Sequence, residues 1–409
     1  MRPFAIALAL LLSCTAAPAV TVPSPSASAS GTAAPSLLAT STPLPTPTPV
    51  PSAAAGGIEV FATGQLHGTY VWIVRQESAA QDRVTELVYA VPLDGSPPLL
   101  ALKRLRDRQD PDIVASRQIS PDGTKLALEH AYLGPAAIDG LAVVDMLNGK
   151  IGYVARGDAR ADVMPAWSPD GTRIAYARRN PGATPVARDD GLWVVDADGS
   201  GVARQVRPPA QFAQVTYVFG WTADGRGIAF GLAFEGVGYS VADVATGTVT
   251  GPSGVVFGMT PASWRSKTPQ FAGAFSEGDK GGEQRIDVAD GIGKPTRTIW
   301  HEPSTDPSNQ EPLLLSARWS PVADEILYVR SAREPKIFRL SAVGGTPREV
   351  PVLGRPFKAE WLPDGRIAII TGQNGIGGVL QIIDGASQSA IFSFPTGASF
   401  TDLAIRTYP

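Results

Sequence analysis

Short apolar segments alternate with polar turns along most of the chain, and one ten-residue pattern recurs. It reads WSPDGTRIAY from Trp167, where apolar positions flank the turn sequence Pro-Asp-Gly. Proline presets φ in such a turn, aspartate bonds nearby backbone, and glycine adopts the positive φ that closes a hairpin. The pattern, called the inner hairpin below, therefore predicts two antiparallel strands. Its other copies are ISPDGTKLAL from Ile119, WTADGRGIAF from Trp221, WRSKTPQFAG from Trp264, WSPVADEILY from Trp319 and WLPDGRIAII from Trp361.

A second apolar hairpin with its own turn follows each inner hairpin. One such outer hairpin also precedes them all, from Glu86, so seven outer hairpins stand against six inner ones. The inner hairpins begin 42 to 55 residues apart, a period typical of propeller blades. The missing inner strand can come from FTDLAIRTYP at Phe400, because closing a ring removes exposed sheet edges. We predict an all-β fold: a β-propeller of about seven four-stranded blades, closed by the C-terminal strand, with six or eight blades as alternatives.

A tryptophan occupies the first position of most inner hairpins. An aromatic residue that recurs at one register is typical of packing rather than chemistry. We therefore expect these side chains to end the innermost strands and to fill the space between neighbouring blades. They are Trp167, Trp221, Trp264, Trp319 and Trp361.

The inner hairpin resembles the TolB-type β-propeller repeat, which also occurs in the propellers of prolyl-oligopeptidase-like proteins. The resemblance rests on W-S-P-D-G followed by a strand such as RIAY, and it covers roughly Gly64 to Pro409. It implies the propeller fold and says little about function. TolB carries an α/β domain before its propeller, whereas here a Pro-rich segment stands in that place. The peptidases carry a hydrolase domain with a G-x-S-x-G nucleophile, and this pentapeptide does not occur in the sequence.

The N-terminal segment predicts export. Arg2 precedes an apolar run that is long enough for a signal peptide and ends in LLSC. This tetrapeptide resembles the bacterial lipoprotein signal, which implies acylation of Cys14, the only cysteine. The following segment, to Gly57, has no charged or aromatic residue and is rich in Ala, Ser, Thr and Pro, so it cannot form a core. We predict a signal peptide over 1–13, a disordered tether over 14–57 and one propeller over 58–409. The protein is then lipid-anchored at the outer face of a bacterial membrane or in the periplasm, or secreted if Cys14 is not lipidated.

The net charge and the motifs of the sequence limit the classes of function to be considered. The net charge of −3 and the absence of a basic stripe argue against nucleic acid as a partner. His67, His130 and His301 are scattered, and none lies beside a nucleophile motif, so we predict no catalytic residue, metal or cofactor. DADGSG from Asp196 resembles the start of a calcium loop, but without the distal acid it is interpreted as a hairpin turn. The RGD tripeptide at Arg156 is interpreted as part of a loop.

Long predicted connections begin at Lys103, Arg156, Arg178 and His301, and they share one face because the loops of a meander alternate between faces. Loops on a rigid scaffold are common binding sites. Mixed charge there suits an envelope protein, a peptide or a glycan. The leading hypothesis is a monomeric, non-enzymatic binding or scaffold module, tethered to the membrane only through Cys14. The alternative is an enzyme, either a metal-dependent polysaccharide lyase or a hydrolase with a loop-built site. The candidate ligand-binding residues are Arg106, Asp110, Asp158, Arg160, Arg178, Asp189, His301, Glu302 and Arg318.

Overall fold

The computed structural model describes residues 57–409 apart from short internal segments. The predictions for the signal peptide, Cys14 and the tether lie outside the described residues. The segments left out are 79–81, 109–111, 130–139, 157–160, 180–189, 209–214, 234–236, 251–262, 266–267, 269, 277–282, 292–295, 304–313, 331–333, 374–375 and 394–397.

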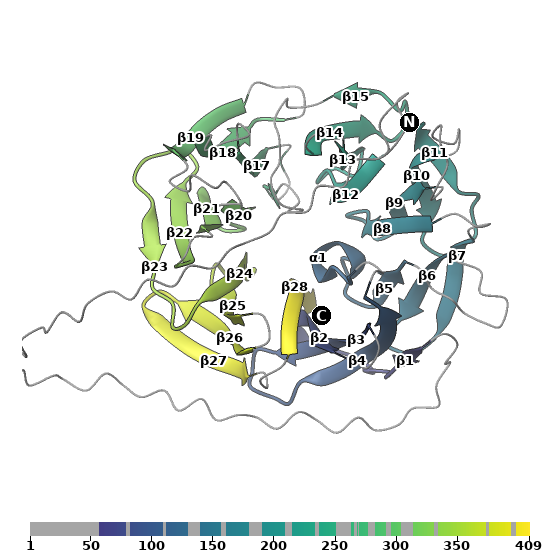
Figure 1. The fold of residues 1–409 in the computed structure, drawn as a ribbon, viewed down its shortest axis with the longest axis horizontal. Coiled ribbons are helices and arrows are strands. Elements are labelled where there is room, and N and C mark those ends of the chain that lie inside the picture. Colours follow the sequence, from purple (N-terminus) through teal and green to yellow (C-terminus); the bar gives the residue numbers. More distant parts are fainter. Residues whose placement is uncertain are drawn as a thin grey trace, which may run out of the picture. The chain divides into compact units, whose positions relative to one another are not determined.

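Seven antiparallel sheets surround a central axis as the blades of a propeller (Figure 1). From the axis outward, blade 1 holds β28 (Ala398–Tyr408), β2 (Gly68–Ser78), β3 (Arg83–Pro92), β4 (Leu99–Asp107) and β1 (Ile58–Val60). Blade 2 holds β5 (Lys125–Leu128), β6 (Gly140–Asp145) and β7 (Ile151–Arg156). Blade 3 holds β8 (Ala161–Trp167), β9 (Arg173–Arg179), β10 (Gly191–Asp196) and β11 (Arg204–Arg207).

The remaining blades follow the same order of four strands. Blade 4 holds β12 (Val215–Trp221), β13 (Gly227–Ala233), β14 (Val237–Asp243) and β15 (Val249–Thr250). Blade 5 holds β16 (Ser263–Trp264), β17 (Phe271–Ser276), β18 (Glu283–Ala289) and β19 (Thr296–Pro303). Blade 6 holds β20 (Leu314–Trp319), β21 (Glu325–Arg330), β22 (Lys336–Ser341) and β23 (Arg348–Val350). Blade 7 holds β24 (Pro356–Trp361), β25 (Ile367–Gln373), β26 (Ile376–Asp384) and β27 (Ser387–Ser393).

The ring closes in blade 1. β28 pairs with β2 from Gly68 opposite Tyr408 to Glu77 opposite Ala398. β1 lies at the other edge of the same blade and pairs with β4. The first and last strands of the propeller thus belong to one sheet, and β28 covers the inner edge that β2 would otherwise expose. This confirms the predicted seven blades and the closure by the C-terminal strand.

Large buried side chains recur at the second strand of the blades. Because successive residues of a strand face opposite sides, one row of each strand packs against the preceding blade and the other against the following one. Five of the six largest fully buried side chains lie in second strands: Trp72 in β2, Tyr176 in β9, Phe230 in β13, Phe271 in β17 and Tyr328 in β21. The sixth, Phe392, lies in the outermost strand β27. The core therefore lies between the blades and repeats around the ring.

The inner turn has the geometry that its sequence predicts. In blade 3, Ser168 Oγ donates to Asp170 Oδ1 (2.6 Å), which also accepts the N–H of Thr172 (3.0 Å). Gly171 has φ of +71°, and its N–H donates to Ser168 O (2.9 Å). The turn is thus fixed by its own side chains. The same side-chain hydrogen bond joins Ser120 to Asp122 in blade 2 and Thr222 to Asp224 in blade 4.

Four of the five recurring tryptophans are 5–7% exposed and end the innermost strands of blades 3, 4, 6 and 7. In three of them the indole Nε1 donates to a carbonyl of the preceding blade, and the acceptor always stands just before the first residue of that blade's inner hairpin. The fifth, Trp264, ends the short strand β16 and is only half-buried. The three bonds run from Trp167 to Gln118 O (2.7 Å), from Trp221 to Ala166 O (2.9 Å) and from Trp361 to Arg318 O (3.1 Å).

Blade 2 departs from the predicted four strands. Its described part has three strands, and the four-residue helix α1 (Ala115–Gln118) stands where the innermost strand was expected (Figure 1). Only Ile119 bridges to Leu126 of β5. The side chain of Gln118 compensates for the missing ladder, because its Nε2 donates to Ala127 O of β5 (3.0 Å).

The predicted long loops are shorter than expected, because strands extend into them. β4 continues from Lys103 to Asp107, and β9 continues through Arg179. β8 begins already at Ala161, and β19 runs on to Pro303. The described part of the proposed loop face is therefore built largely from strand ends.

Candidate functional site: the central cavity

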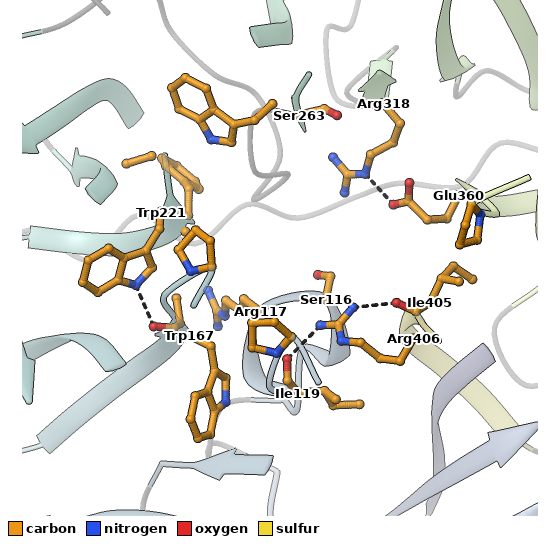
Figure 2. A pocket seen from close by; sticks show the side chains of 18 of the residues that line it. Ser116, Arg117, Ile119, Trp167, Trp221, Ser263, Arg318, Glu360, Ile405 and Arg406 are labelled. Carbon is orange, nitrogen blue, oxygen red and sulfur yellow. Dashed lines mark hydrogen bonds and ion pairs between the residues drawn. The ribbon is translucent and has the colours of Figure 1, made fainter. Parts of the chain in front are cut away.

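A cavity of about 630 Å³ lies where α1 and the innermost strands of blades 3 to 7 and 1 meet (Figure 2). This is within the range typical of small-ligand sites. Pro121, Pro169 and Pro363, which belong to inner turns, also line it. The cavity therefore reaches the face that carries the inner turns.

Aromatic side chains form much of the wall. Trp167, Trp221 and Phe219 come from β8 and β12, and Trp264 comes from β16. The indoles of Trp167 and Trp221 are held by the interblade hydrogen bonds described above, so their orientation is fixed. The half-buried Trp264 contacts Phe271 at 5.1 Å between ring centroids.

The charged residues that line the cavity are three arginines and one glutamate: Arg117, Arg318, Arg406 and Glu360. Arg318 and Glu360 neutralise each other across two blades, with Nε and Oε2 2.8 Å apart (Figure 2). The charged lining therefore has an excess of positive charge, although the whole chain carries −3.

Arg406 joins blade 1 to blade 2 through hydrogen bonds. Its Nε donates to Ser120 O (2.7 Å) and its Nη2 to Ile119 O (2.7 Å). Its Nη1 donates to Ile405 O (2.8 Å). Because every nitrogen of this guanidinium bonds a carbonyl, we interpret Arg406 as a structural residue of the ring closure.

Arg117 is placed differently, because α1 directs its side chain to the cavity (Figure 2). Its Nη1 donates to Val218 O (3.0 Å) of blade 4. Its buried Nε has no hydrogen-bond partner, and the guanidinium makes no ion pair, among the residues that the structure describes. Burial lowers the pKa of Arg117, which the carboxylates of Glu129 and Asp402 oppose, and a guanidinium keeps its charge under such shifts.

Asp402 is fully buried next to α1 and is already paired. Its Oδ2 accepts the N–H of Ser116 (2.7 Å), and its other oxygen forms an ion pair with Lys358. Burial would raise the pKa of Asp402, but Lys358 and Ser116 outweigh it, so this pKa lies below its ordinary value. The carboxylate is thus ionised and fixes the position of α1.

The described members of the predicted ligand face do not gather at one site. Arg106 is buried beside Glu86 in blade 1, and Arg178 forms a bidentate pair with Asp162 (2.7 and 2.8 Å). Both lie in strands, not in the predicted loops. In β19, His301 is exposed and Glu302 pairs with Arg330 (2.5 Å), while Arg318 alone lines the cavity. The other four, Asp110, Asp158, Arg160 and Asp189, lie outside the described residues.

Sequence reasoning missed most of the residues that line the cavity. One register could have revealed them: the residue just before the first position of the inner hairpin faces the axis in five blades. Ser-Arg-Gln before Ile119 also breaks the apolar alternation, which marks the helical replacement in blade 2. The residues at this register are Ala166, Gly220, Ser263, Arg318 and Glu360.

The described residues hold neither a metal-binding cluster nor a membrane-spanning helix. They contain no group of three or more His, Cys, Asp or Glu side chains that could hold a metal ion. His67 lies beside the C-terminus, with Nδ1 2.8 Å from Pro409 O, and His301 lies in the outermost strand of blade 5; His130 is outside the described residues. None of the described helices has the length and apolar character needed to cross a membrane.

Solved structures with the same fold include a prolyl endopeptidase, at 14% identity and a TM-score of 0.51 over 82% of this chain and 50% of that one, so this chain spans half of that protein's length. TolB from Acinetobacter baumannii matches at 14% identity and a TM-score of 0.40, over 82% of this chain and 83% of that one. An oligogalacturonate lyase from Vibrio parahaemolyticus matches at 11% identity and a TM-score of 0.45, over 66% of this chain and 72% of that one. No protein-family model and no curated protein matches the chain. At these identities the likeness concerns the fold alone: the chain is a seven-bladed β-propeller, similar in fold to prolyl endopeptidase.

Proposed function

We propose that the chain is a non-catalytic binding module of the bacterial cell envelope, which holds a protein or glycan partner at the cavity end of the propeller. The observation that carries this proposal is the cavity itself. It is open to the inner-turn face, and aromatic and arginine side chains converge in it. Tryptophan and arginine are the residues that most often anchor a bound partner.

The rigidity of the walls supports recognition. Interblade hydrogen bonds fix two of the wall tryptophans, and the Arg318–Glu360 ion pair ties blade 6 to blade 7. A preformed site loses little conformational entropy when it binds, so more of the contact energy appears as affinity.

The N-terminal sequence supplies the proposed location. A signal peptide followed by Cys14 and a Pro-rich segment would place a monomeric propeller at the membrane surface on a semi-rigid spacer. A binding module at the end of such a tether can reach partners at some distance from the membrane.

The test is cross-linked capture from the envelope of the host, with the full-length protein as bait and residues 1–57 alone as background. Trp264→Ala removes a cavity side chain, whereas Trp300→Ala removes a half-buried tryptophan in the outermost strand of the same blade. We expect a stoichiometric protein or glycan partner that Trp264→Ala loses and Trp300→Ala keeps. Capture by the tether alone, or no enrichment of either class, contradicts the proposal.

A further inference from the structure

The helix that replaces a strand in blade 2 brings a guanidinium into the cavity with spare donors. Arg117 makes one hydrogen bond, to Val218 O, and its buried Nε is unpartnered among the described residues. The nearby carboxylates of Glu129 and Asp402 favour the charge of Arg117, but neither forms an ion pair with it, and Asp402 is paired with Lys358. Buried charges in proteins are usually paired directly or bind ligands. Arg117 can therefore bind an anion.

The other cationic groups of the cavity do not compete for that anion. Arg318 is held by Glu360, and the three nitrogens of Arg406 bond carbonyls of the ring seam. One guanidinium whose Nε has no partner among the described residues matches a singly charged group. A phosphate dianion is usually held by more donors and charges than Arg117 alone supplies. The geometry thus favours a carboxylate.

The surroundings of Arg117 also define the rest of the ligand. Its acceptor Val218 immediately precedes Phe219, which lines the cavity. Trp167 and Trp221 line the same part of the cavity, beside Arg117 (Figure 2). An apolar or aromatic group placed against these rings would be removed from water while the anionic group points to α1.

We propose that Arg117 binds the carboxylate of a ligand whose apolar group packs against Phe219 and Trp221. This deepens, and rests on, the proposed binding function. The carboxylate belongs either to a small aryl acid or to the C-terminus of a peptide, since both present the same monoanion. The charged lining holds three arginines against one glutamate, and such an excess of positive charge attracts an anion.

The experiment is a titration of the full-length protein followed by tryptophan fluorescence, because three indoles line the cavity. The probes are 3-phenylpropionate and its neutral amide, and acetyl-Ala-Phe with a free or an amidated C-terminus. We expect the wild type to prefer each acid over its amide by about 10- to 100-fold, the range for a hydrogen bond to a charged group. The pair with the larger preference and tighter binding identifies the source of the carboxylate.

Arg117→Gln should reduce the acid-to-amide preference to about 3-fold or less, whereas Arg348→Gln, at an exposed outer-strand position of blade 6, should keep it. The preference is a ratio within one variant, so a modest loss of stability does not imitate the effect. Should Arg117→Gln not fold, Arg117→Lys keeps the charge without the planar fork and should give an intermediate preference. Equal binding of acid and amide by the wild type, no binding of any probe, or an unchanged preference in Arg117→Gln overturns the inference. Envelope capture tests the proposed function separately, because it does not depend on these probes.

Discussion

The hydroxyl of Tyr408 joins the two ends of the propeller ring, and its removal should be costly. It donates to Gly123 O of blade 2 (2.8 Å) and accepts the indole N–H of Trp72 of blade 1 (2.9 Å). Trp72 is fully buried and Tyr408 is 6% exposed, so water cannot replace either bond without rearrangement. Tyr408→Phe leaves a buried donor and a carbonyl unsatisfied, at about 1–3 kcal/mol each.

The expected loss for Tyr408→Phe is therefore roughly 2–6 kcal/mol, or about 4–12 °C in melting temperature at roughly 2 °C per kcal/mol for a large domain. Tyr70→Phe is the matched control, because Tyr70 packs edge-on against Tyr408 (5.6 Å) and its hydroxyl has no hydrogen bond among the described residues. Thermal unfolding by far-UV circular dichroism measures both. Equal losses for the two variants, or a change under about 1 °C for Tyr408→Phe, would refute this role of the hydroxyl.

Three further predictions concern the inner turns and the N-terminus. The hydrogen bond from Ser168 lowers the pKa of Asp170 to about 2. The Asp170 carboxylate therefore stabilises the fold above pH 4, and this stabilisation is lost as the pH falls to 2. In a plot of melting temperature against pH, Asp170→Asn should flatten the curve between pH 4 and pH 2. Gly123→Ala should destabilise more than Gly95→Ala, since both have positive φ but only at Gly123 would a Cβ meet the Tyr408 ring; urea unfolding compares them. Cys14→Ser should move the protein from the membrane to the soluble fraction, and retention at the membrane contradicts lipidation.

The fold could be predicted because the repeat specifies local structure and core packing at once. The Pro-Asp-Gly turn and its variants set the inner hairpins, and Trp167 and its counterparts mark where a strand ends against the preceding blade. Even the closing strand was recognisable, since the segment from Phe400 continues the order of strands.

The cavity could not be predicted in the same way, because its walls come from seven distant segments. Nothing local tells Arg117 from a surface arginine: its burial depends on α1 and on the carbonyl of Val218, a hundred residues further along the chain. The sequence-based expectation that long loops carry the binding site also pointed to the face opposite the inner turns. Arg106 and Arg178 satisfied that expectation in sequence, but the strands β4 and β9 extend far enough to pair them internally.

The most direct test of the account is site-specific photo-cross-linking in the native host. A photoreactive residue at Pro363, exposed at the cavity rim, is compared with one at His301, exposed on the face where binding was predicted from the sequence. The account predicts a discrete adduct from position 363 and none from position 301. An adduct from position 301 alone would contradict the claim that the partner binds at the cavity end.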